Sequence, residues 1–185
     1  MKKFELTAEF ITNIFGTKLF RIKALVAFGN VKEGELGGYV GKEENLSQSG
    51  DAWVSGDAWV YGNAWVYGDA WVYGNAKVSG DAWVYGNAKV SGNAEVYGNA
   101  KVYGNVDYTT IKGFGTEFRC TTFFRCKDKF VRVKCGCFYG TIDEFREQVK
   151  KTREGKIAEE YLMIADLMEL HFKTEGEKNN EKEKL

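Results

Sequence analysis

A six-residue repeat runs through the middle of the chain and constrains its fold more than any other feature. From Gly50 the sequence reads Gly-Asx-Ala-x-Val-x nine times without interruption up to Tyr103, and a tenth copy at 104–109 loses the pattern. The last four residues of each hexad alternate with a period of two, which is typical of a β-strand. The Gly-Asx pair favours a turn, because both residues tolerate positive φ. Strands and corners in this rhythm predict a three-sided parallel β-solenoid whose rungs stack about 4.8 Å apart.

The repeat resembles that of the hexapeptide-repeat, left-handed parallel β-helix family over residues 50–109. Typical members of that family are trimeric acyltransferases with three hexads per coil, so the resemblance implies a left-handed coil and a tendency to trimerise. The flanking segments 19–25, 34–40, 44–47 and 133–145 resemble hexapeptide-repeat proteins of unknown function from bacteriophages and prophages. This narrower resemblance implies a viral accessory protein that works in the cytoplasm of its host cell.

The sequence around the repeat predicts a mainly β protein of four segments. Residues 1–49 form an N-terminal β cap, because an open solenoid end would expose its core and its strand edges. Residues 50–109 form the solenoid. Residues 110–173 form a small α+β unit, in which a β-hairpin precedes two helices and Thr141 with Glu144 is a capping box. Residues 174–185 are charged and lack apolar content before the last residue, which predicts a disordered tail.

Bulk composition narrows the function classes. The chain has 26 basic and 26 acidic residues, so its net charge favours no purely electrostatic partner such as duplex DNA. We expect no membrane span, because no stretch approaches the roughly 20 apolar residues that a span requires. The N-terminus resembles no export signal. We therefore expect reduced thiols in a cytoplasm.

Catalytic and metal chemistry find little support in the sequence. Hexapeptide acyltransferases use a histidine base, whereas the single histidine here, His171, lies far from any hexad. The hexad aspartates alternate with asparagine, which cannot accept a proton as a base does. The four cysteines lack the Cys-x₂-Cys spacing of a zinc site, and we place them on the apolar face of the C-terminal hairpin. We expect no enzyme activity, no metal and no cofactor; a divergent acyltransferase is the alternative. The four thiols belong to Cys120, Cys126, Cys135 and Cys137.

The outward positions of the hexads carry the strongest candidate for a binding site. Three hexads per coil bring residues 18 apart onto one face, and rings gather there. So many outward aromatic side chains exceed what a monomer usually exposes, and Trp and Tyr dominate protein interfaces. We expect a binding protein that contacts itself, as a dimer or trimer, or a foreign protein, for which the phage resemblance implies a host protein such as a defence nuclease that it inhibits. A nucleotide or small-molecule binder that stacks bases on Trp at a subunit boundary is the alternative. The binding candidates are Trp65, Trp83, Tyr67, Tyr85 and Tyr103 on one face, and Trp53, Trp71 and Tyr73 on a second.

A basic stretch in the C-terminal hairpin is a secondary candidate. Strand alternation there predicts one solvent-exposed basic face that also carries Phe123, and such faces bind single-stranded nucleic acid or acidic proteins. We favour an ordinary solvated face over nucleic-acid binding. The basic residues are Arg119, Arg125, Lys127, Arg132 and Lys134.

Overall fold

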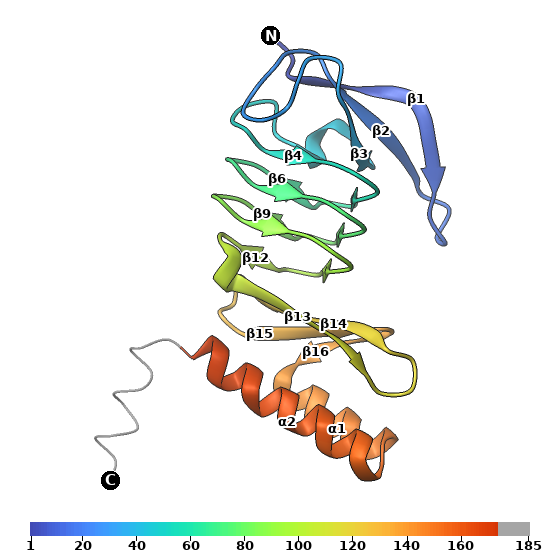
Figure 1. Ribbon diagram of the computed structural model, residues 1–185, viewed down its shortest axis with the longest axis vertical. Helices are drawn as coiled ribbons and strands as arrows, with labels where there is room; N and C mark the ends of the chain where they lie inside the picture. The colour runs from blue at the N-terminus through green and yellow to red at the C-terminus, as the bar shows by residue number, and fades with distance from the viewer. Residues whose placement is uncertain (174–185) are drawn as a thin grey trace, which may run out of the picture.

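A computed structural model describes residues 1–173, and the tail predicted at 174–185 lies outside the described residues. The chain forms a column in which an N-terminal cap, a β-solenoid, a β-sheet and a pair of helices follow one another along the long axis (Figure 1). The predicted fold class, a mainly β solenoid followed by a small α+β unit, is confirmed.

The solenoid consists of nine two-residue strands, β4 to β12, arranged as three parallel walls. Partners in neighbouring rungs are 18 residues apart, as in Trp65 with Trp83 and Val66 with Val84. The Val and Ala of every hexad point inward and are buried, so the alternation of the sequence sets which side chains form the core. The strands are β4 Trp53–Val54, β5 Trp59–Val60, β6 Trp65–Val66, β7 Trp71–Val72, β8 Lys77–Val78, β9 Trp83–Val84, β10 Lys89–Val90, β11 Glu95–Val96 and β12 Lys101–Val102.

Glycine is required at the corners of the coil for two reasons. Gly80 has a φ of +74°, which L side chains rarely adopt. A Cβ atom on Gly80 would also lie 2.8 Å from the backbone nitrogen of Gly98 in the next rung. The Asx side chains beside the glycines form ladders along the corners, as where Asn63 donates to Asp81 at 3.1 Å. The Gly-Asx pair therefore shapes the turn and links successive turns.

The N-terminal cap is a β-meander that continues one wall of the coil. Strand β1 (Phe4–Thr12) pairs with β2 (Lys18–Ala24), which pairs with β3 (Leu36–Val40). Strand β3 then lies parallel to β5, with Tyr39 in register with Trp59, so the coil geometry begins before Gly50. A short 3-10 helix, η1 (Glu43–Asn45), leads into the residues above β6.

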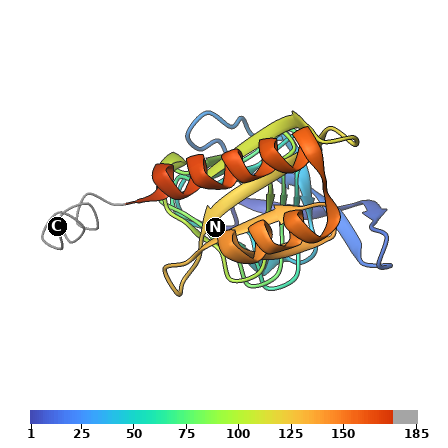
Figure 2. The same cartoon turned by 90° about the horizontal axis from the view of Figure 1, so that it is seen from below.

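The C-terminal unit closes the other end of the coil in two layers (Figure 2). Its sheet has four antiparallel strands where the sequence predicts a single hairpin. Phe124 on one face packs into the solenoid core, whereas Phe123 on the opposite face packs against the helices. The elements are η2 Asn105–Asp107, β13 Tyr108–Phe114, β14 Arg119–Arg125, β15 Val131–Cys135, β16 Phe138–Thr141, α1 Ile142–Thr152 and α2 Gly155–Phe172.

The predicted capping box begins α1. The hydroxyl of Thr141 accepts from the backbone N–H of Glu144, and the carboxylate of Glu144 accepts from the backbone N–H of Thr141 at 2.7 Å. The hydrogen bonds that the carboxylate accepts from the backbone N–H and the hydroxyl of Thr141 lower the pKa of Glu144. Helix α1 ends at Thr152, and Gly155 is the first residue of α2 rather than the end of α1. In the described part of the chain, no helix has the length and apolar character needed to cross a membrane.

Candidate binding surface

Five rings on the wall formed by β6, β9 and β12 make a continuous stack, which we call the aromatic face: Trp65, Tyr67, Trp83, Tyr85 and Tyr103. Trp65 stacks on Tyr67 with 4.0 Å between centroids, and Tyr67 stacks on Tyr85 at 4.9 Å. Tyr103 extends the column with an edge contact to Tyr85 at 5.1 Å. The predicted ladder is therefore present, and in its first rung Trp65 and Tyr67 also stack on each other, which holds these two rings in fixed positions.

The two ends of the aromatic face differ in shape and charge. Beside Trp65 an open hollow of about 540 Å³ is lined in part by Glu43 and Glu44. At the other end Tyr103 protrudes, with 62% of its surface exposed. Lys127 stands over the ring of Trp83 at 3.9 Å and donates to the carbonyl oxygen of Asp81. The face thus runs from a hollow lined by two carboxylates at one end to a projecting ring at the other, with the ammonium of Lys127 over its middle rung.

The predicted second face is smaller than expected because Trp53 is not on the surface. Its exposed fraction is 0%, and its ring makes edge contacts with Phe4 and Phe28 of the cap. The N-terminal cap, which precedes the repeat in the sequence, therefore covers the outward position of the first rung. Trp71 is half-buried against the core and Tyr73 is exposed, so this wall presents little aromatic surface.

The five basic residues do not share one face, which corrects the sequence prediction. The register pairs Phe124 with Arg132 and Phe123 with Val133. Arg132 therefore points to the solenoid side of the sheet, whereas Arg125, like Phe123, points to the helix side. The assumption of a solvated face was wrong because this sheet is covered on both sides: Phe123 and Phe124 are fully buried.

Most of these cations have anionic partners close by. Arg125 lies 3.4 Å from Asp107 and donates to the carbonyl oxygen of Phe172. Arg132 pairs with Asp128 at 2.7 Å, Lys134 lies 3.6 Å from Glu95, and Arg119 lies 3.9 Å from Glu117. Lys127 instead lies over the Trp83 ring of the aromatic face. Arg125 and Lys134 thus tie the sheet to α2 and to the coil, whereas Arg132 and Arg119 pair within the turns of the sheet, so the arrangement does not form a common basic patch.

The cysteines are distributed over both sides of the sheet, not along one apolar face as predicted. Cys126 is buried in the solenoid core, where burial raises its pKa to about 11. Cys120 is half-buried, and burial raises the pKa of its thiol as well. Cys137 is exposed. Among the described residues, no three His, Cys, Asp or Glu side chains converge as metal ligands would.

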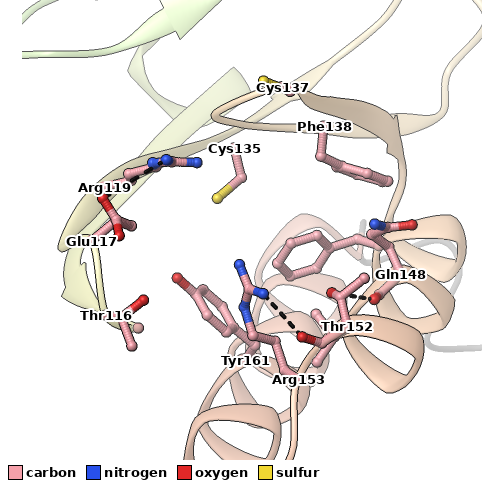
Figure 3. Close-up of a pocket in the computed structure, with 13 residues that line it drawn as sticks. Thr116, Glu117, Arg119, Cys135, Cys137, Phe138, Gln148, Thr152, Arg153 and Tyr161 are labelled. Carbon is pink, nitrogen blue, oxygen red and sulfur yellow. Dashed lines mark hydrogen bonds and ion pairs between the residues drawn. The ribbon is translucent and has the colours of Figure 1, made fainter.

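Cys135 points into a cavity of about 170 Å³ between the sheet and the helices (Figure 3). Arg119, Arg153 and Tyr161 also line this cavity, and so does Cys137, although its sulfur points away from the centre. The thiol of Cys135 accepts a hydrogen bond from the hydroxyl of Thr121 at 3.1 Å. A threonine hydroxyl is no base at neutral pH, so this contact does not activate the sulfur as a nucleophile. The hydroxyl of Tyr161 is itself held by the carbonyl oxygen of Phe114.

His171, the residue most relevant to acyl transfer, lies on the last turn of α2 with its ring exposed and in edge contact with Phe172. Sequence reasoning missed an apolar stripe on the same helix. Met163, Leu167 and Leu170 are exposed on its outer side. Their spacing of four and three residues was available in the sequence as the signal of a helix face, but it competed with the buried face that was identified.

Comparison with known proteins supports the repeat architecture. A family model described as the YdcK beta solenoid repeat matches residues 59–74 and again residues 70–86. Both matches lie inside the coil, on strands β5 to β9, and leave the cap and the C-terminal unit unmatched. No curated protein matches the chain. The chain therefore contains a β-solenoid repeat, with flanking units on which the comparisons are silent.

Proposed function

We propose that this chain is a non-enzymatic binding protein whose aromatic face forms a protein–protein interface. The observation that carries the proposal is the ordered ring stack from Trp65 to Tyr103, part of which is open to solvent. Large rings that are already fixed lose little conformational entropy when a partner covers them. Trp and Tyr at the centre of a patch supply most of the binding energy of typical interfaces.

The first partner that this surface fits is a second copy of the same chain. In a dimer with a two-fold axis, the same patch of both copies is in contact, and the two patches run in opposite directions. With the axis near the central rung of Trp83, the protruding Tyr103 of one copy meets the hollow beside Trp65 of the other. The same reversal brings the exposed Glu44 toward Lys101. Shape and charge both support an antiparallel dimer over the trimer that the hexapeptide family implies.

A pair of matched substitutions tests this proposal. Serine already occupies the last hexad position at Ser55, Ser79 and Ser91, so the coil accepts Tyr103→Ser. Tyr73→Ser makes the same change on the neighbouring wall and serves as the control. Sedimentation velocity at micromolar concentration should give twice the chain mass of 20.9 kDa for the wild type and for Tyr73→Ser. Tyr103→Ser should shift toward monomer, because each Tyr103 would fill the hollow of the partner copy, and loss of an aromatic ring that fills a pocket often costs an interface about 2 kcal/mol or more.

A wild-type protein that stays monomeric throughout the concentration range would refute self-association. The aromatic face would then serve a foreign protein. The resemblance of the flanking segments to phage proteins supports a host protein in the cytoplasm, such as a defence nuclease that the chain inhibits. In that case Tyr103→Ser, and not Tyr73→Ser, should abolish inhibition of the purified host protein.

A further inference from the structure

A second cavity lies on a different wall of the coil, where all three parts of the molecule meet. We call it the arm groove. It measures about 640 Å³, which is within the usual range of small-molecule sites. Its floor is the wall of β5, β8 and β11. One side is the tip of the β1–β2 hairpin, which hangs alongside the coil (Figure 1), and the other is the turn between β15 and β16.

The hairpin tip is held in place although its apolar side chains are exposed. The side-chain oxygen of Asn13 accepts from the backbone N–H groups of Phe15 and Thr17, both at 2.9 Å. Asn13 is buried, whereas the ring of Phe15 is 79% exposed at the edge of the groove. An ordered tip that presents a ring over a cavity is suited to cover a bound molecule.

Lys77 lines the groove, and its ammonium group forms no ion pair within the described residues. Lys77 lies between Trp59 and Glu95 in the stack of rungs. The carboxylate of Glu95 turns to Lys134 at 3.6 Å, and the ammonium of Lys77 lies 4.7 Å from the centroid of the Trp59 ring. Within residues 1–173, no carboxylate oxygen lies within 4 Å of this ammonium. The groove therefore favours an anionic ligand and disfavours a cationic one.

Aromatic side chains that line the groove are the second feature that would select a ligand. Tyr97 is 41% exposed and is held by an edge contact with Tyr139 at 5.2 Å. One face of Trp59 is occupied by Lys77. Of the rings that the coil contributes to the groove, Tyr97 is the most exposed, and Phe15 lines the groove from the hairpin tip. Flat rings in fixed positions favour a planar aromatic ligand, because offset stacking and edge contacts add to its burial.

We propose that the arm groove binds a planar aromatic small molecule that carries a single anionic group, either a carboxylate or a phosphate. The ring packs against Tyr97 beneath Phe15, and the anion pairs with the ammonium of Lys77. This site is independent of the aromatic face, since it lies on the wall of β5, β8 and β11 rather than that of β6, β9 and β12.

Calorimetric titration with small probes tests the proposal. The panel consists of adenosine 5′-monophosphate, indole-3-acetate and 4-hydroxybenzoate, together with adenosine, indole-3-acetamide and inorganic phosphate as probes that lack either the charge or the ring. We expect at least one aromatic anion to bind with a stoichiometry of one per chain. Its neutral counterpart and phosphate alone should bind at least about tenfold more weakly, the usual effect of losing one charge-assisted contact.

Two pairs of variants locate the site. Lys77→Met should weaken binding of the anion about tenfold, whereas Lys89→Met, the same hexad position on another wall, should leave it unchanged. Tyr97→Ser should weaken binding, and Tyr73→Ser should not. Thermal unfolding checks that each variant is folded. The proposal is overturned if no aromatic anion binds at millimolar concentration, if neutral analogues bind equally well, or if Lys77→Met and Lys89→Met behave alike.

Discussion

Trp53 and Trp71 occupy the same hexad position in successive rungs of one wall, with their Cα atoms in register, yet substitution by lysine should affect them very differently. Lysine already occupies this position in the next rung at Lys89, so the repeat itself tolerates the change. Trp71 is half-buried, and a lysine there can extend its ammonium into water. We expect Trp71→Lys to lower the free energy of unfolding by about 1–2 kcal/mol.

Trp53→Lys should be far more damaging, because the ring is fully buried between the coil and the cap. Removing a buried Trp side chain of roughly 200 Å² forfeits about 5 kcal/mol of burial at 25 cal/mol/Å². The new ammonium would also be desolvated close to Lys3, which donates to the carbonyl oxygen of Ala52 at 2.8 Å. The lost burial and the desolvation of the ammonium together approach the whole free energy of unfolding of an ordinary domain, about 5–15 kcal/mol. We therefore expect the cap to detach or the chain to unfold.

Urea denaturation followed by circular dichroism measures both effects, and hydrogen exchange over residues 1–49 shows whether the cap alone is released. If Trp53→Lys and Trp71→Lys lose similar stability and the cap amides stay protected, then Trp53 is not sealed by Phe4 and Phe28 and the reasoning fails.

Two further predictions follow from groups whose pKa is shifted. Burial lowers the pKa of Lys3 to about 8, and Asp51 opposes the shift only in part. Between pH 8 and the ordinary lysine pKa of 10.5 the unfolded chain holds a proton on Lys3 that the folded chain has released, so the contribution of this group to stability rises with pH. The unfolding free energy of the wild type should thus increase relative to that of Lys3→Met over this range, and parallel curves would show that Lys3 does not titrate there. Cys126, with its pKa raised to about 11, should resist maleimide at pH 8 in the folded protein while the exposed Cys137 reacts. Mass spectrometry of labelled peptides decides this, and equal labelling of both thiols contradicts the burial of Cys126.

The coil could be predicted from sequence because its geometry is local and repeated. Each hexad places Val inward and fixes a glycine at a corner of positive φ, and 18 residues return the chain to the same wall. The partners of Trp65 follow from this arithmetic alone. The stack within a rung, such as Trp65 on Tyr67, was not predicted, because alternation gives the side of the strand but not the direction in which a ring folds over.

The wrong predictions concern residues whose surroundings are formed by segments that lie far away in the sequence. Trp53 follows the hexad pattern as well as Trp71 does, but Phe4 and Phe28 cover it. In the C-terminal sheet, the alternation along each strand is correct, whereas the register across the turn at Lys129, a residue with positive φ, was misjudged. A shift of one residue moves every side chain to the opposite face, and this is why Arg132 and Arg125 were placed together.

The three walls of the coil present different surfaces, partly because of the segments that flank the repeat. The outward hexad positions already differ from wall to wall, since rings gather on the wall of β6, β9 and β12 whereas Lys77 and Glu95 lie on the wall of β5, β8 and β11. Further differences arise at the ends: the cap buries the first ring of one wall, Lys127 of the C-terminal unit stands over Trp83 on the second, and the hairpin tip with Lys134 encloses the third. The wall with the ring stack keeps Trp65 and Tyr103 exposed and would suit a broad surface, whereas the enclosed wall would suit a small molecule. On the functions proposed above, the segments that flank the repeat would add to the specificity of its outward residues, and variants of the hairpin tip should change ligand binding while leaving self-association intact.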